Sequence, residues 1–93
     1  MLGERRRNLR EPKKVKITVK GTDSNRTSFE EETETIDLSP SGLSFHLKTP
    51  VFVRALLSIE IHSRGILSGK FQALVVRVDT SRQEGQFVAV LIL

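Results

Sequence analysis

The sequence predicts an all-β protein whose strands form a six-stranded antiparallel β-barrel. Apolar residues recur with a period of two, polar or glycine-containing turns separate these stretches at regular spacing, and no stretch keeps a helical period. A chain of 93 residues is long enough for one domain with a single core. Six short strands of this kind are typical of a closed or nearly closed barrel.

The alternating stretches cover residues 15–19, 33–36, 43–47, 57–61, 69–78 and 86–93. In the first, valine and isoleucine alternate with lysine and threonine, as in a strand with one face buried and one in water. In the fifth, strict alternation places Val78 on the face opposite Ala73. We expect loops over residues 21–32, including Phe29, and over the polar turn 79–85.

The composition favours an anionic partner. The net charge is +4 and the pI is about 10.0. Eight of the 15 basic residues lie in the first twenty positions, at Arg5, Arg6, Arg7, Arg10, Lys13, Lys14, Lys16 and Lys20. We therefore expect residues 1–12 to be a flexible basic arm and residues 13–93 to be the barrel. The alternative is that the basic arm is only a solvated terminus.

Other classes of protein receive little support. No cysteine is present, which excludes disulfides and thiolate metal sites. No apolar run approaches the roughly 18 residues of a membrane span. The N-terminus has no apolar region typical of a secretory signal, so we expect a cytoplasmic protein without a membrane span.

Two polar motifs stand out, RRRNLR at Arg5–Arg10 and DLSPSG at Asp37–Gly42. The segment Ser39–Gly42 is typical of a type I turn, because proline suits its second position and glycine its fourth. Neither motif has a nearby catalytic base. The motifs therefore indicate a site that holds a ligand.

Read as Arg-Arg-x-x-x-Arg and Asp-x-Ser-x-x-Gly, the pair resembles the signature of the PilZ domain family, and the resemblance covers nearly the whole chain. It implies a small barrel of PilZ type that binds the bacterial second messenger cyclic di-GMP without enzymatic activity or a cofactor. Arg6 and Arg10 are then the essential pair, and Arg5 implies two ligand molecules per site. Family members act in motility, exopolysaccharide production, adhesion and virulence.

The motif residues have the chemistry that cyclic di-GMP requires. A guanidinium can bind phosphate oxygens or the O6 and N7 acceptors of guanine, and it can stack on a base. Asp37 can accept from guanine N1 and N2, Ser39 can donate to a phosphate or ribose oxygen, and Gly42 lets the backbone come close. Arg77, in an apolar strand, either approaches the ligand or pairs with a carboxylate.

One feature departs from the family pattern, in which a helix commonly follows the last strand. The sequence ends in an apolar run with no such helix, so we expect a barrel without it. Phe87, Ala89, Leu91 and Leu93 share one face of the last strand, and apolar residues also occupy its other face. We expect this outer face to be buried by a homodimer, a partner protein or a C-terminal segment absent from this sequence.

Several alternatives remain. A PilZ-like interaction module would use the last strand as its contact surface, with weak or no ligand binding. A barrel that binds single-stranded nucleic acid would need stacking aromatics, but tyrosine and tryptophan are absent and Phe29 is the one phenylalanine expected to be exposed. Asp37 and Ser39 with His46 or His62 supply the residue types of a hydrolytic triad, yet strand histidines are usually surface residues. Two histidines without a clustered third ligand do not make a zinc site.

Overall fold

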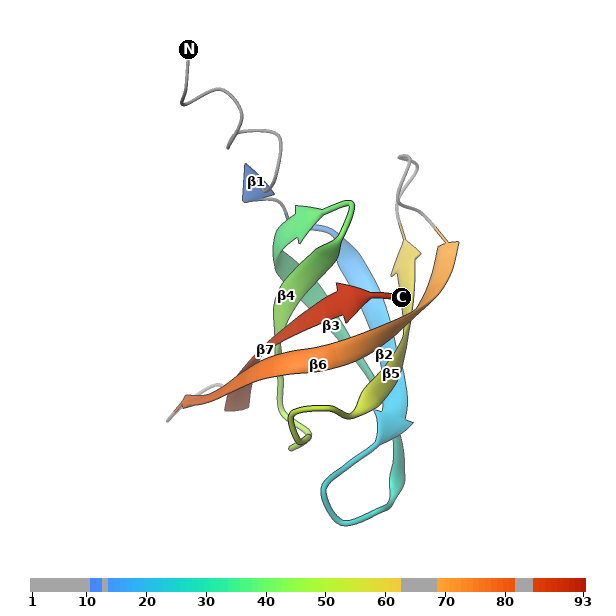
Figure 1. Ribbon diagram of the computed structural model, residues 1–93, viewed down its shortest axis with the longest axis vertical. Coiled ribbons are helices and arrows are strands. Elements are labelled where there is room, and N and C mark those ends of the chain that lie inside the picture. Colours follow the sequence, from blue (N-terminus) through green and yellow to red (C-terminus); the bar gives the residue numbers. More distant parts are fainter. Residues whose placement is uncertain (1–10, 13, 63–68, 82–84) are drawn as a thin grey trace.

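The computed structural model describes residues 11–12, 14–62, 69–81 and 85–93. The motif Arg5–Arg10 lies outside these residues. The strands are β1 (Glu11–Pro12), β2 (Lys16–Thr22), β3 (Ser28–Ser39), β4 (Gly42–Leu47), β5 (Leu56–His62), β6 (Gly69–Ser81) and β7 (Gly85–Ile92) (Figure 1). The described residues contain no helix.

Six strands close into an antiparallel barrel. Their order is β3, β2, β5, β6, β7 and β4, and β4 pairs back with β3 (Figure 1). The short β1 pairs with β3 as well, opposite Asp37 and Leu38 and beyond the segment that β2 occupies. The predicted six-stranded antiparallel barrel is confirmed. The last two residues of the expected arm, Glu11 and Pro12, pair with the barrel.

The inward-facing side chains of all six barrel strands form one core. Ile17, Phe45, Ile59 and Val88 are fully buried, each on a different strand. Burying a side chain of this size stabilises the fold by about 1.5–3 kcal/mol. The period-two pattern of the sequence therefore identified the interior correctly.

The expectation of a loop before residue 33 is wrong, because β3 begins at Ser28. Phe29 lies within this strand and packs partly buried against the core. The strand was not visible in the sequence because its first half has little apolar content. Glu31 pairs with the buried Val19 but is polar, and its carboxylate accepts the N–H groups of Lys48 (2.8 Å) and Thr49 (3.0 Å).

The β6–β7 hairpin is also longer than expected. Strand β6 continues to Ser81 instead of ending before Asp79, and β7 begins at Gly85. Gly85 has φ +91°, a conformation that L-residues rarely adopt. A Cβ there would also collide with the carbonyl oxygen of Leu47.

Two β-bulges interrupt the alternation of inner and outer residues. One shifts the β3–β4 register between Thr35 and Asp37, and the other shifts the β6–β7 register between Val75 and Arg77. After the second bulge, Val78 pairs with Val88 and packs against the core. The expectation that Val78 faces away from Ala73 is therefore wrong. A bulge adds one residue and reverses the faces that follow it.

Candidate ligand-binding site

The second motif forms the β3–β4 hairpin, with Pro40 and Ser41 as its turn residues. The turn lies where the sequence placed it, although Asp37, Leu38 and Ser39 belong to β3 and Gly42 begins β4. Ser39 is 8% exposed. Its hydroxyl donates to the carbonyl oxygen of Gly42 (3.2 Å) and lies 3.3 Å from the hydroxyl of Ser41. Ser39 thus ties the turn together and points to no histidine.

The structure explains why position 42 requires glycine, which the sequence analysis did not predict. A Cβ at this position would collide with the carbonyl oxygen of Val90 on the neighbouring strand β7. Glycine therefore permits the close approach of β4 and β7 that helps to close the barrel. No local pattern in the sequence indicates which strand would pass beside Gly42.

Strand β1 connects the two motifs. Glu11 pairs with Leu38 and Pro12 pairs with Asp37. Arg10 directly precedes Glu11 in the chain, so their Cα atoms are about 3.8 Å apart. Arg6 is five residues from Glu11, and its Cα can lie at most about 18 Å away. The side chains of Arg5, Arg6 and Arg10 lie outside the described residues, but the attachment point of their segment is beside Asp37.

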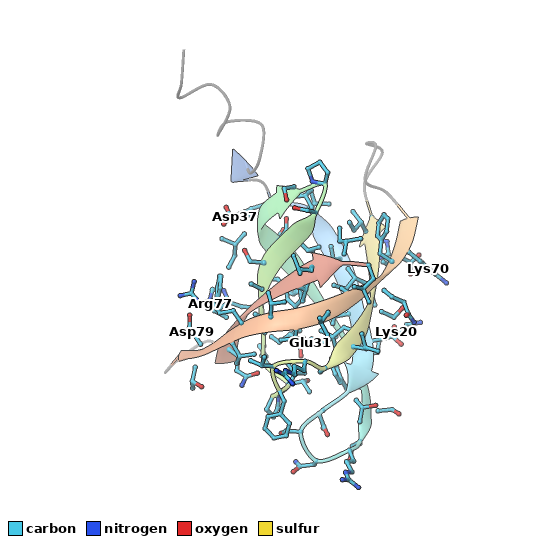
Figure 2. The ribbon with its side chains drawn as sticks, viewed as in Figure 1. Lys20, Glu31, Asp37, Lys70, Arg77 and Asp79 are labelled. Carbon is cyan, nitrogen blue, oxygen red and sulfur yellow. The ribbon has the colours of Figure 1, made fainter. Side chains whose placement is uncertain are left out.

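Asp37 belongs to a row of four paired residues on the outer face of the barrel, here called the outer row. Asp37 pairs with Ser44, Ser44 with Ala89, and Ala89 with Arg77. Paired residues share a face of the sheet, so the row runs across β3, β4, β7 and β6. Figure 2 shows Asp37 and Arg77 on one side of the barrel, and Lys20 and Lys70 on the other.

At one end of the outer row, Arg77 binds a carboxylate. Its Nε donates to Oδ2 of Asp79 (2.9 Å), and its Nη2 lies 2.8 Å from the same oxygen. The guanidinium also lies 5.6 Å from the centroid of the Phe87 ring, which meets His46 in a T-shaped contact at 6.0 Å. Of the two roles expected for Arg77, the structure shows carboxylate pairing. The side chain is 67% exposed and remains accessible.

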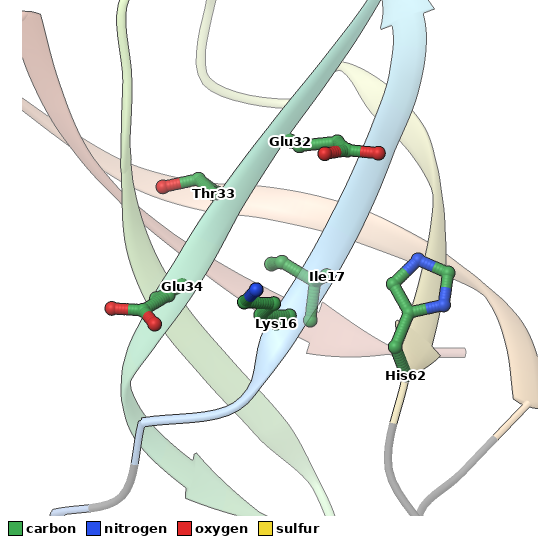
Figure 3. A pocket seen from close by; sticks show the side chains of 6 residues that line it. All are labelled: Lys16, Ile17, Glu32, Thr33, Glu34 and His62. Atoms are coloured by element: carbon green, nitrogen blue, oxygen red, sulfur yellow. The ribbon is translucent and has the colours of Figure 1, made fainter.

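Two open pockets adjoin strand β3. One, of about 450 Å³, includes Ile36 and His46 and thus borders the outer row. The other, of about 500 Å³, lies over β2, β3 and β5 and carries Lys16, Glu32, Glu34 and His62 (Figure 3). His62 hydrogen-bonds to Thr18 at 2.8 Å. Neither pocket contains a residue of the Asp37–Gly42 motif.

Two other kinds of feature, metal-binding groups and membrane-spanning helices, were sought among the described residues. The described part of the chain contains no group of three or more histidine or acidic residues arranged to hold a metal ion. Among the same residues, no helix is long and apolar enough to cross a membrane.

The family of the chain follows from these features together with a comparison. The sequence matches the PilZ domain family over residues 4–90, a range that includes both motifs and almost the entire barrel. The chain belongs to the PilZ domain family. No curated protein matches it. PilZ domains are generally non-catalytic receptors for cyclic di-GMP.

Proposed function

We propose that this PilZ domain is a non-enzymatic receptor for cyclic di-GMP, acting in the cytoplasm. The observation that supports this best is the pairing of β1 with β3. Glu11 and Pro12 lie opposite Leu38 and Asp37, so the residues that directly follow the arginine motif in the chain pair with the hairpin motif. Two motifs far apart in the sequence thereby serve one site.

In this proposal, the arm supplies the cations and the hairpin supplies the guanine acceptor. Arg6 and Arg10 bind phosphate oxygens or guanine, and Arg5 serves a second ligand molecule. Asp37 accepts from N1 and N2 of guanine. Ser39 donates to the ligand only if it exchanges its hydrogen bond to the Gly42 carbonyl.

The energies are compatible with a reversible signal. Ordering about six backbone residues costs roughly 6–12 kcal/mol. Each charge-assisted hydrogen bond returns about 1.5–3 kcal/mol, and each base stacked on arginine returns roughly 1–3 kcal/mol. Several contacts must form together to exceed this cost, and a net of roughly 8 kcal/mol would correspond to a micromolar complex. Binding then places the arm on the barrel and changes the surface that a partner meets.

Calorimetric titration with cyclic di-GMP tests the proposal. Wild-type protein is compared with Arg6→Ala/Arg10→Ala and with Lys20→Ala/Lys70→Ala, which removes two positive charges on the other side of the barrel (Figure 2). We expect saturable binding that the arginine variant loses by at least about 100-fold, as two charge-assisted contacts imply, and that the lysine variant keeps. A folded wild-type protein that gives no binding heat would refute the receptor function.

A second candidate function, an interaction module, is favoured by a separate observation. Every large apolar side chain that is strongly exposed among the described residues lies on β5, β6, β7 or the adjoining loop and C-terminal residue. These are Phe52, Val53, Leu56, Val76, Leu91 and Leu93. Leu91 pairs with Leu74 and Leu74 pairs with Leu56, which makes a continuous outer surface. We call these seven residues the apolar wall.

A second copy of the chain is the partner that fits the apolar wall best. The wall itself is apolar, so two identical walls can pack across a two-fold axis if the exposed Arg54, between Val53 and Leu56 in the chain, stays at the rim in water. Monomers rarely expose a contiguous apolar surface of more than a few hundred Å². Because the barrel is closed, the contact is made between sheet faces and not between strand edges.

Sedimentation velocity over a range of concentrations tests this dimer. We expect wild-type protein to associate, Leu56→Lys to remain monomeric, and Ser58→Lys, two residues along the same strand, to behave as wild type. A wild-type protein that stays monomeric at every concentration would exclude the dimer and leave the wall to a different protein.

The nucleic-acid alternative loses its one aromatic candidate, because Phe29 is half-buried. The phenylalanine that is strongly exposed is Phe52 (66%), in the loop before β5. A single exposed ring does not make the series of stacking platforms that single strands require. Affinity for oligonucleotides that falls steeply with salt would revive this alternative.

A further inference from the structure

Ser44 is the buried polar residue of the described chain that has no partner. It is 3% exposed, and its hydroxyl makes no hydrogen bond. Unpaired buried hydroxyls are uncommon in native proteins, and each needs an explanation. Ser44 lies in the outer row between Asp37 and Ala89, next to the hairpin motif. The hydroxyl is covered in this structure, so a ligand that displaces the cover would meet an unpaired hydroxyl at this place.

The two ends of the outer row are turned outward by the two β-bulges. Thr35 and Val75 face the interior, so strict alternation would direct Asp37 and Arg77 inward as well. The extra residue in each bulge, Ile36 or Val76, reverses this, and Asp37 and Arg77 pair with residues of the outer face. Bulges are common beside binding sites because they re-aim a side chain in this way. Here two of them serve the same row.

The middle of the row is a low floor between charged ends. Ser44 and Ala89 have small side chains, whereas Asp37 and Arg77 can reach above them. Neighbouring strands are about 4.8 Å apart, so the three steps from Asp37 to Arg77 span about 14 Å. This length accommodates a purine base with one polar group at each edge. Phe87 lies under the guanidinium of Arg77 and supports it from below.

We infer that the outer row is a binding shelf for one guanine base of the ligand, an inference that rests on the proposed receptor function. The base lies over Ser44 and Ala89. Asp37 accepts from N1 and N2 of guanine, while Arg77 donates to O6 and N7 at the other edge. The hydroxyl of Ser44, buried in the free protein, donates to the ligand once the groups that cover it move aside. The barrel thus contributes contacts that neither sequence motif includes.

Asp79 sets how readily Arg77 is released to the ligand. Both Nε and Nη2 of Arg77 are directed at Asp79 Oδ2 in the structure. A base that binds Arg77 must share or replace that carboxylate, and the negative charge of Asp79 also opposes an anionic ligand. Asp79 therefore weakens binding and holds Arg77 in position until the ligand arrives.

Calorimetric titration of the full chain with cyclic di-GMP tests the shelf. We expect Arg77→Ala to bind at least 10-fold more weakly and Asp79→Asn to bind about 3- to 10-fold more tightly. Lys70→Ala removes a positive charge on the other side of the barrel and should leave the affinity unchanged. In Arg77→Ala/Asp79→Asn most of the gain should vanish, because only the small part due to the lost negative charge of the exposed Asp79 is independent of Arg77.

Two further measurements separate a ligand contact from a structural role. Ser44→Ala removes a hydroxyl with no protein partner, so Tm should not fall while affinity drops about 3- to 10-fold. Cyclic di-AMP presents an N6 donor where guanine has its O6 acceptor. The preference for cyclic di-GMP over cyclic di-AMP should therefore shrink in Arg77→Ala.

The outcomes distinguish the shelf from the receptor function. Wild-type binding that depends on Arg6 and Arg10 but is unchanged in Arg77→Ala, Asp79→Asn and Ser44→Ala overturns the shelf alone. Absence of binding in folded wild-type protein overturns both.

Discussion

Two walls of the same barrel differ sharply in their outer surfaces. On β3, β2 and β5, charged residues face one another across the strands, as in the pairs of Lys16 with Glu34 and Lys20 with Glu30. Glu32, Glu60 and His62 continue this surface, which we call the charged wall. On β5, β6 and β7, the apolar wall carries leucine and valine at the equivalent outward positions.

The inner surfaces of the two walls are alike, so the fold does not account for the difference. Ile17 and Val19 behind the charged wall are as completely buried as Ala73 and Val75 behind the apolar wall. The outward residues are not fixed by the core, and their character reflects what each wall contacts. The charged wall has the composition of a surface in water, and the apolar wall has the composition expected for the proposed contact with a second copy.

The outer row adjoins the apolar wall. Strand β7 supplies Ala89 to the row and Leu91, two residues further, to the wall. The same strand faces both the proposed ligand and the proposed partner copy. A change of position in β7 on ligand binding would therefore reach the apolar wall directly, while the charged wall lies across the barrel.

The interior shared by both walls gives the largest expected effect. Phe45 is completely buried, and Phe45→Ala should lower the free energy of unfolding by about 3–5 kcal/mol because it leaves a cavity. Urea denaturation measures this loss, with Ser58→Ala on the exposed face as the control. A loss below about 1 kcal/mol would mean that the core is not the common support of the two walls.

A smaller effect is expected where β3 meets the residues before β2. The hydroxyl of Thr35, 1% exposed, accepts the N–H of Val15 at 2.9 Å. Thr35→Val leaves that N–H without its acceptor and should cost about 1–3 kcal/mol. Hydrogen exchange at the Val15 amide should accelerate, while the amides of the apolar wall should change less. Equal acceleration throughout the barrel would show that the two regions open as one unit.

The apolar wall should respond weakly as long as the protein is dilute. Leu91 is 46% exposed, so Leu91→Gln should change the free energy of unfolding by less than about 1 kcal/mol at low concentration. Binding of a hydrophobic dye should decrease in this variant and remain unchanged in Lys20→Met. A large loss of stability in dilute solution would place Leu91 in the monomer's own core.

The charged wall should give the smallest effect. Lys20 and Glu30 lie 4.0 Å apart, with 51% and 62% of their side chains exposed. Lys20→Met should alter stability by less than about 0.5 kcal/mol, because exposed ion pairs are screened by water and salt. Thermal unfolding should detect this stability difference in low salt, and the difference should disappear in high salt. A loss that persists in high salt would contradict the view of this wall as a plain solvent surface.

The sequence was sufficient for the number of strands, their direction and most of the core. Alternating valine, isoleucine and leucine report directly which face of a strand is buried. The first half of β3 escaped notice because Glu30, Glu32 and Glu34 face water and Glu31 caps a loop, so little apolar signal remains. Phe52 was expected in the core, but it is exposed in the loop before β5. A local sequence pattern does not show which way a side chain in a loop points.

The candidate site was foreseen only in its motifs. The positions of Asp37 and Arg77 on one outer face depend on two bulges, and a single extra residue in a strand leaves no mark in composition or period. The requirement for glycine at position 42 comes from the close approach of β7, which lies almost fifty residues further along the chain. Both features arise from strand pairing at long range, which local sequence patterns do not encode.

The pairing of Glu11 and Pro12 with β3 has a consequence for binding strength that is separate from any single contact. The pairing fixes one end of a short segment of chain beside the hairpin, and the other end of that segment carries the arginines. Whatever path residues 1–10 follow, a tether no longer than about 18 Å keeps Arg6 at an effective concentration in the millimolar range or above at the hairpin. The same arginines supplied as a free peptide would have to be present at that concentration to compete with the attached arm.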